Sequence, residues 1–292
     1  MSADCYALTG GVRARAELTV ESGAVADCLR WRCAPPIVLR QTGPNRVHVV
    51  QAAGGPLGGD ELVLDVKLGA DTHTQMRSAA AMVVQAGGPP AVARWTVAAT
   101  LEPGAALDWQ PQPTVVCDGA ELHSQMTVTL QRGAHAVLRD EVVLGRAGQR
   151  GGRFVGELTV DLEGAPLLAH TLLLDGADPV LAGPAGTGGA RVVGMLAMVG
   201  EGIDRPPEGA GEEPGLRWAW SALDGPGWLL LALGDRVIDV SRRLDQAVQE
   251  WPGSARTWSR TARGVSDESQ PRKQILGPAR PGALGGGAYP EV

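Results

Sequence analysis

The chain has 292 residues, of which 44% are hydrophobic, and it carries a formal net charge of −6. This length and apolar content allow one large domain or two ordinary ones with a hydrophobic core, and they exclude a disordered protein. The acidic balance argues against nucleic acid as the main partner. Glycine supplies 41 residues, but without a three-residue period, which excludes a collagen-like chain.

The beginning of the chain has neither the basic region nor the apolar region of a signal peptide. The longest apolar run, residues 228–233, is too short to span a membrane. We therefore expect a cytoplasmic protein with no membrane partner. The spacing of the four cysteines does not fit a zinc site, and we expect them to be reduced thiols: Cys5, Cys28, Cys33 and Cys117.

Strand-like runs recur along the chain, each bounded by Gly, Pro or Asp. Residues 61–66 and 126–130 alternate between polar and apolar side chains, which predicts strands with one buried face. In chain order the predicted strands are 15–21, 46–51, 61–68, 91–101, 124–130, 136–144, 154–162, 167–174, 217–222 and 228–233.

A Gly-Ala pair follows three of these runs, at Gly69, Gly104 and Gly133. Glycine can adopt positive φ without steric cost, as tight turns between strands often require. Repeats spaced by roughly 30 residues are typical of stacked layers. The sequence therefore predicts a mainly β protein whose antiparallel or mixed strands stack in an elongated, β-helix-like or sandwich arrangement.

The C-terminal part is expected to contain a few helices. Residues 192–199 form an apolar stretch that could be strand or helix. Residues 235–251 have apolar side chains at helical spacing, with Asp235 as the expected cap and Pro252 as the stop. We expect residues 1–251 to form a single β domain. Residues 252–292, with six basic and three acidic side chains, are expected to form a disordered basic tail.

Two segments have unusual turn chemistry. Residues 54–60 read G-G-P-L-G-G-D, a glycine-dense turn that ends in a carboxylate before a strand. Residues 107–114 read L-D-W-Q-P-Q-P-T, where Pro111 and Pro113 keep the backbone extended and remove two N–H donors. This second stretch belongs at a sheet edge or a strand crossing, with Trp109 as its anchor. It is either a rigid corner or an interface.

The usual catalytic motifs are missing. The glycines of residues 183–189 are not followed by the Lys-Ser/Thr of a phosphate loop, and neither G-x-S-x-G nor H-E-x-x-H occurs. The five histidines are dispersed and form no local ligand pair.

The order of three motifs resembles the urease accessory protein UreD family, called UreH in some bacteria. The motifs are G-G-x-x-x-G-D at residues 54–60, L-x-W-x-P-Q-P-T at 107–114, and E-V-V-L-G-R at 141–146. The resemblance extends from about Arg13 to Trp251. The chain departs from the family pattern at Met82, close to a typical Lys, and at residues 150–154, which lack the family's Glu.

The resemblance implies a scaffold protein and not an enzyme. Proteins of this family have stacked strands with a few helices near the C-terminal part. They bind apo-urease and a UreF-like accessory protein, which recruits a UreG-like GTPase. The assembly passes nickel to the urease active site through a water-filled tunnel. The resemblance thus implies no permanently bound cofactor and no fixed metal site, with Ni²⁺ as a transient cargo.

Nickel in transit needs hydrated, oxygen-lined walls with scattered carboxylates, because a close His or Cys cage would trap it. We select Asp60 and Glu141, which lie in matched motifs, and Asp175, which ends a predicted strand, as candidates for the tunnel wall. The helix at residues 237–251 is a weaker candidate for partner binding than the corner. The partner-interface candidates are Trp109, Gln110, Pro111, Gln112, Pro113 and Thr114.

Two other functions stay open at this point. One is a polysaccharide-active enzyme on stacked strands, with Asp60 and Glu141 as catalytic carboxylates. The other is a purely structural β protein. Such enzymes are usually secreted and rich in exposed aromatic side chains, whereas this chain begins with no signal-peptide pattern and has only 4% aromatic residues, which weighs against the enzyme.

Overall fold

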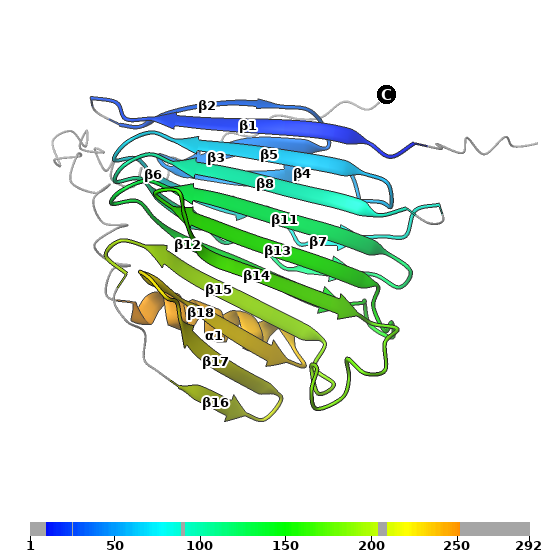
Figure 1. The fold of residues 1–292 in the computed structure, drawn as a ribbon. Helices are drawn as coiled ribbons and strands as arrows, with labels where there is room; N and C mark the ends of the chain where they lie inside the picture. The colour runs from blue at the N-terminus through cyan, green and yellow to red at the C-terminus, as the bar shows by residue number, and fades with distance from the viewer. Residues whose placement is uncertain (1–9, 25, 89–90, 204–208, 252–292) are drawn as a thin grey trace, which may run out of the picture.

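A computed structural model describes residues 10–24, 26–88, 91–203 and 209–251 (Figure 1). The predicted tail, 252–292, lies outside these residues, as does Cys5. The described residues form eighteen strands and one helix: β1 (Arg13–Glu21), β2 (Cys28–Cys33), β3 (Ile37–Gly43), β4 (Arg46–Gln51), β5 (Glu61–Leu68), β6 (His73–Ser78), β7 (Met82–Val84), β8 (Ala93–Leu101), β9 (Ala106–Trp109), β10 (Thr114–Val116), β11 (Glu121–Leu130), β12 (His135–Leu144), β13 (Arg153–Leu162), β14 (Ala165–Asp175), β15 (Val192–Gly200), β16 (Ala210–Glu213), β17 (Leu216–Ala222), β18 (Gly227–Gly234) and α1 (Val237–Glu250).

The strands form two stacked sheets. The seven-stranded sheet has the order β14-β13-β11-β8-β5-β1-β2, and the eleven-stranded sheet contains β16-β17-β18-β15-β12-β9-β6-β4-β3, with β10 and β7 beside this path. In Figure 1 the seven-stranded sheet lies in front. The eleven-stranded sheet lies behind it and extends below it, through β15, β18, β17 and β16.

The middle of the molecule is a parallel solenoid. The chain crosses from β5 to β6, back to β8, and so on through β9, β11, β12 and β13, so that each strand pairs in parallel with its equivalent one coil later. Antiparallel hairpins close both ends, with β2 and β3 on one side and β14 to β18 on the other. The predicted class, a mainly β protein of stacked strands, is confirmed.

Three stacked turns link the coils. Asp71, Gly104 and Gly133 each have positive φ, at 58°, 72° and 73°. Asp71 N donates to Pro103 O and Gly104 N donates to Arg132 O, both at 3.0 Å. The sequence placed Gly69 in this repeat, but Asp71 holds the equivalent position. Asp, with its short polar side chain, is one of the few residues that tolerate the left-handed region.

The main core lies between the two sheets. The strands that flank it bury alternate side chains, as in β1, where Ala14, Ala16, Leu18 and Val20 face inward and their neighbours face solvent. This is the pattern expected for a sheet with one covered face.

Strand β15 differs, because all nine of its residues are buried. One face, which includes Ala197 and Val199, belongs to the core between the sheets, and the other, with Leu196 and Met198, packs against α1. Burial on both faces removes the polar positions that would reveal a strand's period. The apolar stretch that the sequence left open is therefore a strand.

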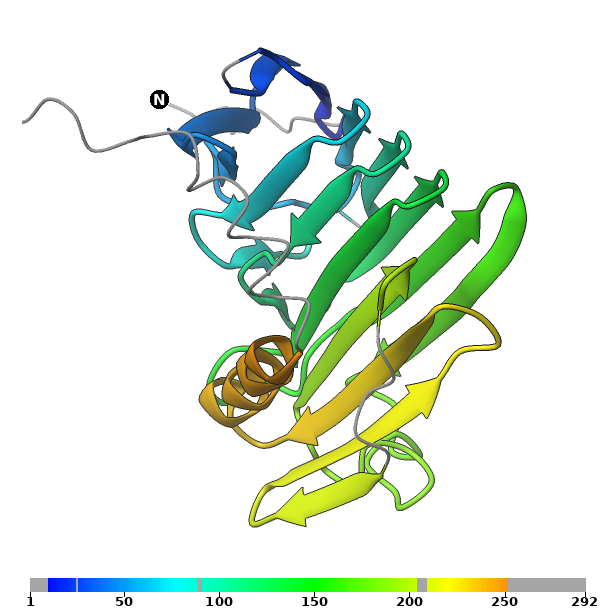
Figure 2. The same cartoon turned by 90° about the vertical axis from the view of Figure 1, so that its left-hand side faces the viewer.

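Helix α1 covers the outer face of the eleven-stranded sheet, as the side view in Figure 2 shows. Val240, Leu244 and Ala247 form its buried face. The predicted cap was wrong, because Arg236 occupies the N-cap position without a side-chain hydrogen bond. The described residues contain this one α-helix, and it is neither long nor apolar enough to cross a membrane.

Candidate functional site

A cavity of about 230 Å³ lies between the two sheets. Most of its wall is apolar. Trp95, Met126 and Leu158 line it from the seven-stranded sheet, and Trp109 and Met195 line it from the eleven-stranded sheet.

A few polar side chains also reach this cavity. Asp140, on β12, is flanked on its own face by Leu138 and Val142, which belong to the core between the sheets. Ser124 on β11 and His170 on β14 line the cavity from the opposite sheet. The cavity thus presents a carboxylate from one sheet and an imidazole and a hydroxyl from the other.

The surroundings change the proton affinity of both titratable groups. Burial raises the pKa of Asp140 to about 6, and the negative charge of Glu141 adds to this effect. Burial lowers the pKa of His170, whose Nε2 has no hydrogen-bond partner among the described residues. Above pH 6 the cavity therefore holds an ionised carboxylate and a neutral imidazole, both of which can contact a cation.

These two groups do not form a closed metal cage. Within the described ranges, no cluster of three or more His, Cys, Asp and Glu side chains could hold a metal ion. A cation in the cavity would meet one or two protein groups and would keep several waters, so that binding would be weak.

The eleven-stranded sheet is interrupted at the cavity wall. Strand β9 pairs with β12 up to Leu138, and β10 pairs with β12 only from Val142 onward. Between them residues 110–113 leave the ladder, because Pro111 and Pro113 have no N–H to donate. Their neighbour Gln112 donates its backbone N–H to Ser78 Oγ at 2.8 Å.

The predicted partner-binding corner therefore surrounds this interruption. Trp109, Pro111, Gln112 and Thr114 all line the cavity, and Trp109 is its buried anchor. Gln112 is exposed. The rigid-corner interpretation is what the geometry displays, and the predicted interface role stays a prediction.

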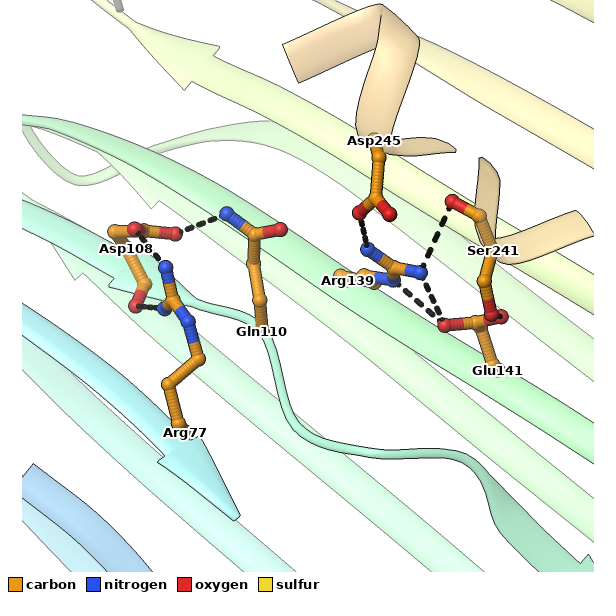
Figure 3. A network of polar contacts seen from close by, with 7 residues as sticks. All are labelled: Arg77, Asp108, Gln110, Arg139, Glu141, Ser241 and Asp245. Carbon is orange, nitrogen blue, oxygen red and sulfur yellow. Dashed lines mark hydrogen bonds and ion pairs between the residues drawn. The ribbon is translucent and has the colours of Figure 1, made fainter. Parts of the chain in front are cut away.

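Two polar networks flank the interruption on the outer face of the sheet (Figure 3). In the first, the buried Asp108 carboxylate accepts hydrogen bonds from Arg77 Nη2 and Gln110 Nε2, both at 2.5 Å. Arg77 Nη1 also donates to Asp108 O at 2.9 Å. This network fixes the point where the chain leaves the ladder.

The second network contains Glu141, one of the predicted tunnel residues. Glu141 accepts from Arg139 Nε at 2.7 Å and from Ser241 Oγ at 2.6 Å, and Arg139 Nη1 also contacts Asp245 at 2.5 Å. Neighbours on a strand point to opposite faces. Glu141 therefore faces α1, and Asp140 faces the cavity. The network attaches α1 to β12.

Asp60 and Asp175, the other two predicted tunnel residues, hold turns. Asp60 Oδ1 accepts from Val12 N at 2.8 Å and Oδ2 accepts from Leu57 N at 2.9 Å, which fixes the glycine-dense turn. Asp175 Oδ1 accepts from Ala177 N at 2.9 Å. Neither lines the cavity, although Gly55 of the Asp60 turn does. Their predicted roles in nickel transfer stay predictions.

Sequence reasoning missed Asp140 and His170. A signal for Asp140 was present, because it alternates with the apolar residues Leu138 and Val142 on a predicted strand. His170 carried a weaker signal, because the apolar runs on either side of it, residues 167–169 and 172–174, obscure the alternation of β14 in the sequence.

The fold and the site define a class of protein: a two-sheet β-solenoid that encloses a cavity with a buried carboxylate and an imidazole on opposite walls. Comparison with known proteins identifies the family. The family model described as UreD urease accessory protein matches residues 10–264. Urease accessory protein UreD of Frankia alni is 37% identical over 80% of this chain and 91% of its own length. The UreD of Streptomyces coelicolor is 34% identical over 82% and 97%. The chain therefore belongs to the UreD urease accessory protein family.

Proposed function

We propose that this protein is the scaffold on which urease receives its nickel. It binds apo-urease and a UreF-like protein, reaches a UreG-like GTPase through UreF, and conducts Ni²⁺ through the cavity between its sheets. Family membership supports a urease accessory role, which is a maturation role and not a catalytic one.

The observation that carries the nickel part is the placement of Asp140 and His170. They line the same cavity from opposite sheets, and within the described residues they are not joined by a third ligand. A carboxylate lowers the electrostatic cost of bringing a cation into an apolar space. So few ligands leave Ni²⁺ mostly hydrated, which permits release as well as binding.

The test is the nickel content of urease matured with Asp140→Asn in place of the parent. We expect the variant to co-purify with UreF-like protein and apo-urease as the parent does, while nickel per urease falls several-fold. Asp161→Asn, on the outward side of β13, is the matched control and should leave nickel unchanged. Unchanged nickel with Asp140→Asn would contradict passage through this cavity.

The accessory role has its own test, which does not depend on the route of nickel. Deletion of this protein should leave the urease subunits present but poor in nickel and inactive. Fully active urease in the deletion strain at ordinary nickel concentration would exclude the role. Co-purification with UreF-like protein and apo-urease tests the proposed partners directly.

The double variant Asp60→Ala/Glu141→Ala tests the sequence-based tunnel residues. Asp60 fixes a turn and Glu141 attaches α1 to β12, so the substitutions can also destabilise the fold. The stability of the double variant must therefore be measured together with the nickel content of urease. Lower nickel with unchanged stability and assembly would support a direct role for them.

A further inference from the structure

Methionine side chains form part of the wall of the cavity between the sheets. Met126 on β11 lines it from the seven-stranded sheet, and Met82 on β7 and Met195 on β15 line it from the eleven-stranded sheet. The whole chain has only six methionines, so half of them border this one space. The cavity therefore offers thioether sulfur as a donor, in addition to the carboxylate and the imidazole described above.

The exposure of two of these methionines shows that they border open space. Val128 on β11 is buried, whereas Met126, two positions away on the same face of the strand, is only partly buried. On β15, Ala197 has no exposed surface, whereas Met195 on the same face is 8% exposed. Residues that face the core between two sheets stay accessible only where the packing leaves a gap. The side chains of Met126 and Met195 therefore meet the cavity and not a closed core.

An imidazole lies in the same row of the sheet as Met126. Met126 is opposite Leu158 on β13, and Leu158 is in turn opposite His170 on β14. His170 Nε2 is buried without a hydrogen-bond partner among the described residues, and burial lowers the pKa of the ring. The ring is therefore neutral at physiological pH, and a neutral imidazole can donate a nitrogen lone pair to a metal ion.

The donors come from both walls of the cavity and can meet in it. Stacked sheets lie about 10 Å apart, so side chains from facing sheets reach the same space. A methionine side chain has three rotatable bonds, which let its sulfur adjust to an ion. Met195 is also directly opposite Asp140 in the pairing of β12 with β15. A carboxylate thus lies beside the sulfur, and its negative charge favours a cation at this place.

We propose that Met126, Met195 and His170 form a site for one soft monovalent cation of the Cu⁺ class. Thioether sulfur is a soft donor that selects Cu⁺, whereas oxygen and imidazole donors suit divalent ions such as Ni²⁺. Trp95 and Trp109 also line the cavity, and indole rings attract cations to their faces. The site shares His170 with the proposed nickel route, but it does not rest on that function, because its sulfur ligands and its ion are different.

Nuclear magnetic resonance of the full-length chain, with isotope-labelled methionine methyl groups, tests the site. Ag⁺ is the probe, because it has the charge and softness of Cu⁺ and is stable in air. The described cysteines lie outside the cavity, and their thiols take up Ag⁺ first, but the methyl signals report the thioethers alone. We expect the Met126 and Met195 signals to shift together and to saturate with one further Ag⁺. Met198, buried on the opposite face of β15, is the matched control and should not shift.

Substitution by leucine removes the sulfur and keeps the volume of the side chain, so the fold should be retained. Met126→Leu and Met195→Leu should each weaken Ag⁺ binding at the other methionine at least tenfold, and His170→Asn should weaken it at both. Met198→Leu should bind Ag⁺ as the parent does. No shift at Met126 and Met195, or an equal shift at Met198, would overturn the proposal. Equal affinity of the parent and the first two variants would also overturn it. Since urease and nickel are absent from this test, its failure would leave the proposed accessory role untouched.

Discussion

Asp140 shows how one buried carboxylate can oppose stability. Its pKa is raised from 3.8 to about 6, so the folded protein holds this proton more tightly than the unfolded chain does. The stability associated with the protonated form is complete below pH 4 and is lost as the pH rises through 6. At pH 8 the ionised carboxylate costs roughly 3 kcal/mol.

Asp140→Asn should therefore be more stable than the parent at pH 8, by an amount on the order of 1–3 kcal/mol. The difference should shrink as the pH falls and vanish below pH 4, because both side chains are then neutral. Urea unfolding at pH 8, 6 and 4 measures this, with Asp161→Asn as the reference. A constant difference at all three pH values would contradict the raised pKa. Together with lower nickel delivery, a gain at pH 8 would identify Asp140 as a residue kept for function at the expense of stability.

Substitution of Gly87 tests how closely this residue packs against the glycine-dense turn at residues 54–60. A Cβ at this position would lie 2.5 Å from the backbone oxygen of Gly58, which cannot move independently of its turn. We expect Gly87→Ala to destabilise the fold by about 1–3 kcal/mol. Gly88→Ala is the matched control, because nothing lies within 4 Å of its Cβ position. Equal melting temperatures for the two variants would show that the turn is looser than described.

At the scale of the element, α1 is attached by a buried charge network as well as by apolar packing. The Arg139 and Glu141 side chains are 8% and 1% exposed, so each depends on the other for charge compensation. Arg139→Met should cost about 3–5 kcal/mol, because it leaves Glu141 buried without a counter-charge.

Chemical unfolding monitored by fluorescence measures this loss. Arg242→Met removes an exposed arginine on the outside of the same helix and should change stability by less than about 1 kcal/mol. The double variant Arg139→Met/Glu141→Leu should recover much of the loss, since no buried charge is then left unpaired. A double variant as unstable as Arg139→Met would mean that the loss came from packing and not from charge.

At the scale of the whole molecule, the two sheets together form the walls of one cavity. Ser124→Leu places a larger apolar side chain in the cavity without altering Asp140 or His170. We expect assembly with the partners to be retained and nickel per urease to fall several-fold. Gln125→Leu, which adds a comparable side chain to the exposed face of the same strand, is the control. Normal nickel with Ser124→Leu, in a variant shown to fold, would place the route elsewhere.

Much of the architecture follows from local patterns. Alternation predicted the long strands, helical spacing predicted α1, and the prolines at 111 and 113 predicted a break in a sheet. Seven short strands were not predicted, because three to seven residues provide too little periodicity: β2, β3, β6, β7, β9, β10 and β16. The sequence analysis missed Asp71 because it expected a glycine at each turn position with positive φ, and it therefore placed Gly69 there.

The sequence by itself determined where the chain turns and where buried and exposed side chains alternate along a strand, because these features depend on neighbours within a few residues. Only the tertiary structure decided which strands pair and what each strand face contacts, because that depends on segments far apart in the chain. Glu141, which the sequence suggested for the tunnel wall, therefore faces α1, and its neighbour Asp140 faces the cavity. For the same reason, His73 and His135 lie 62 positions apart in the sequence, yet strand register places them on either side of Ala106.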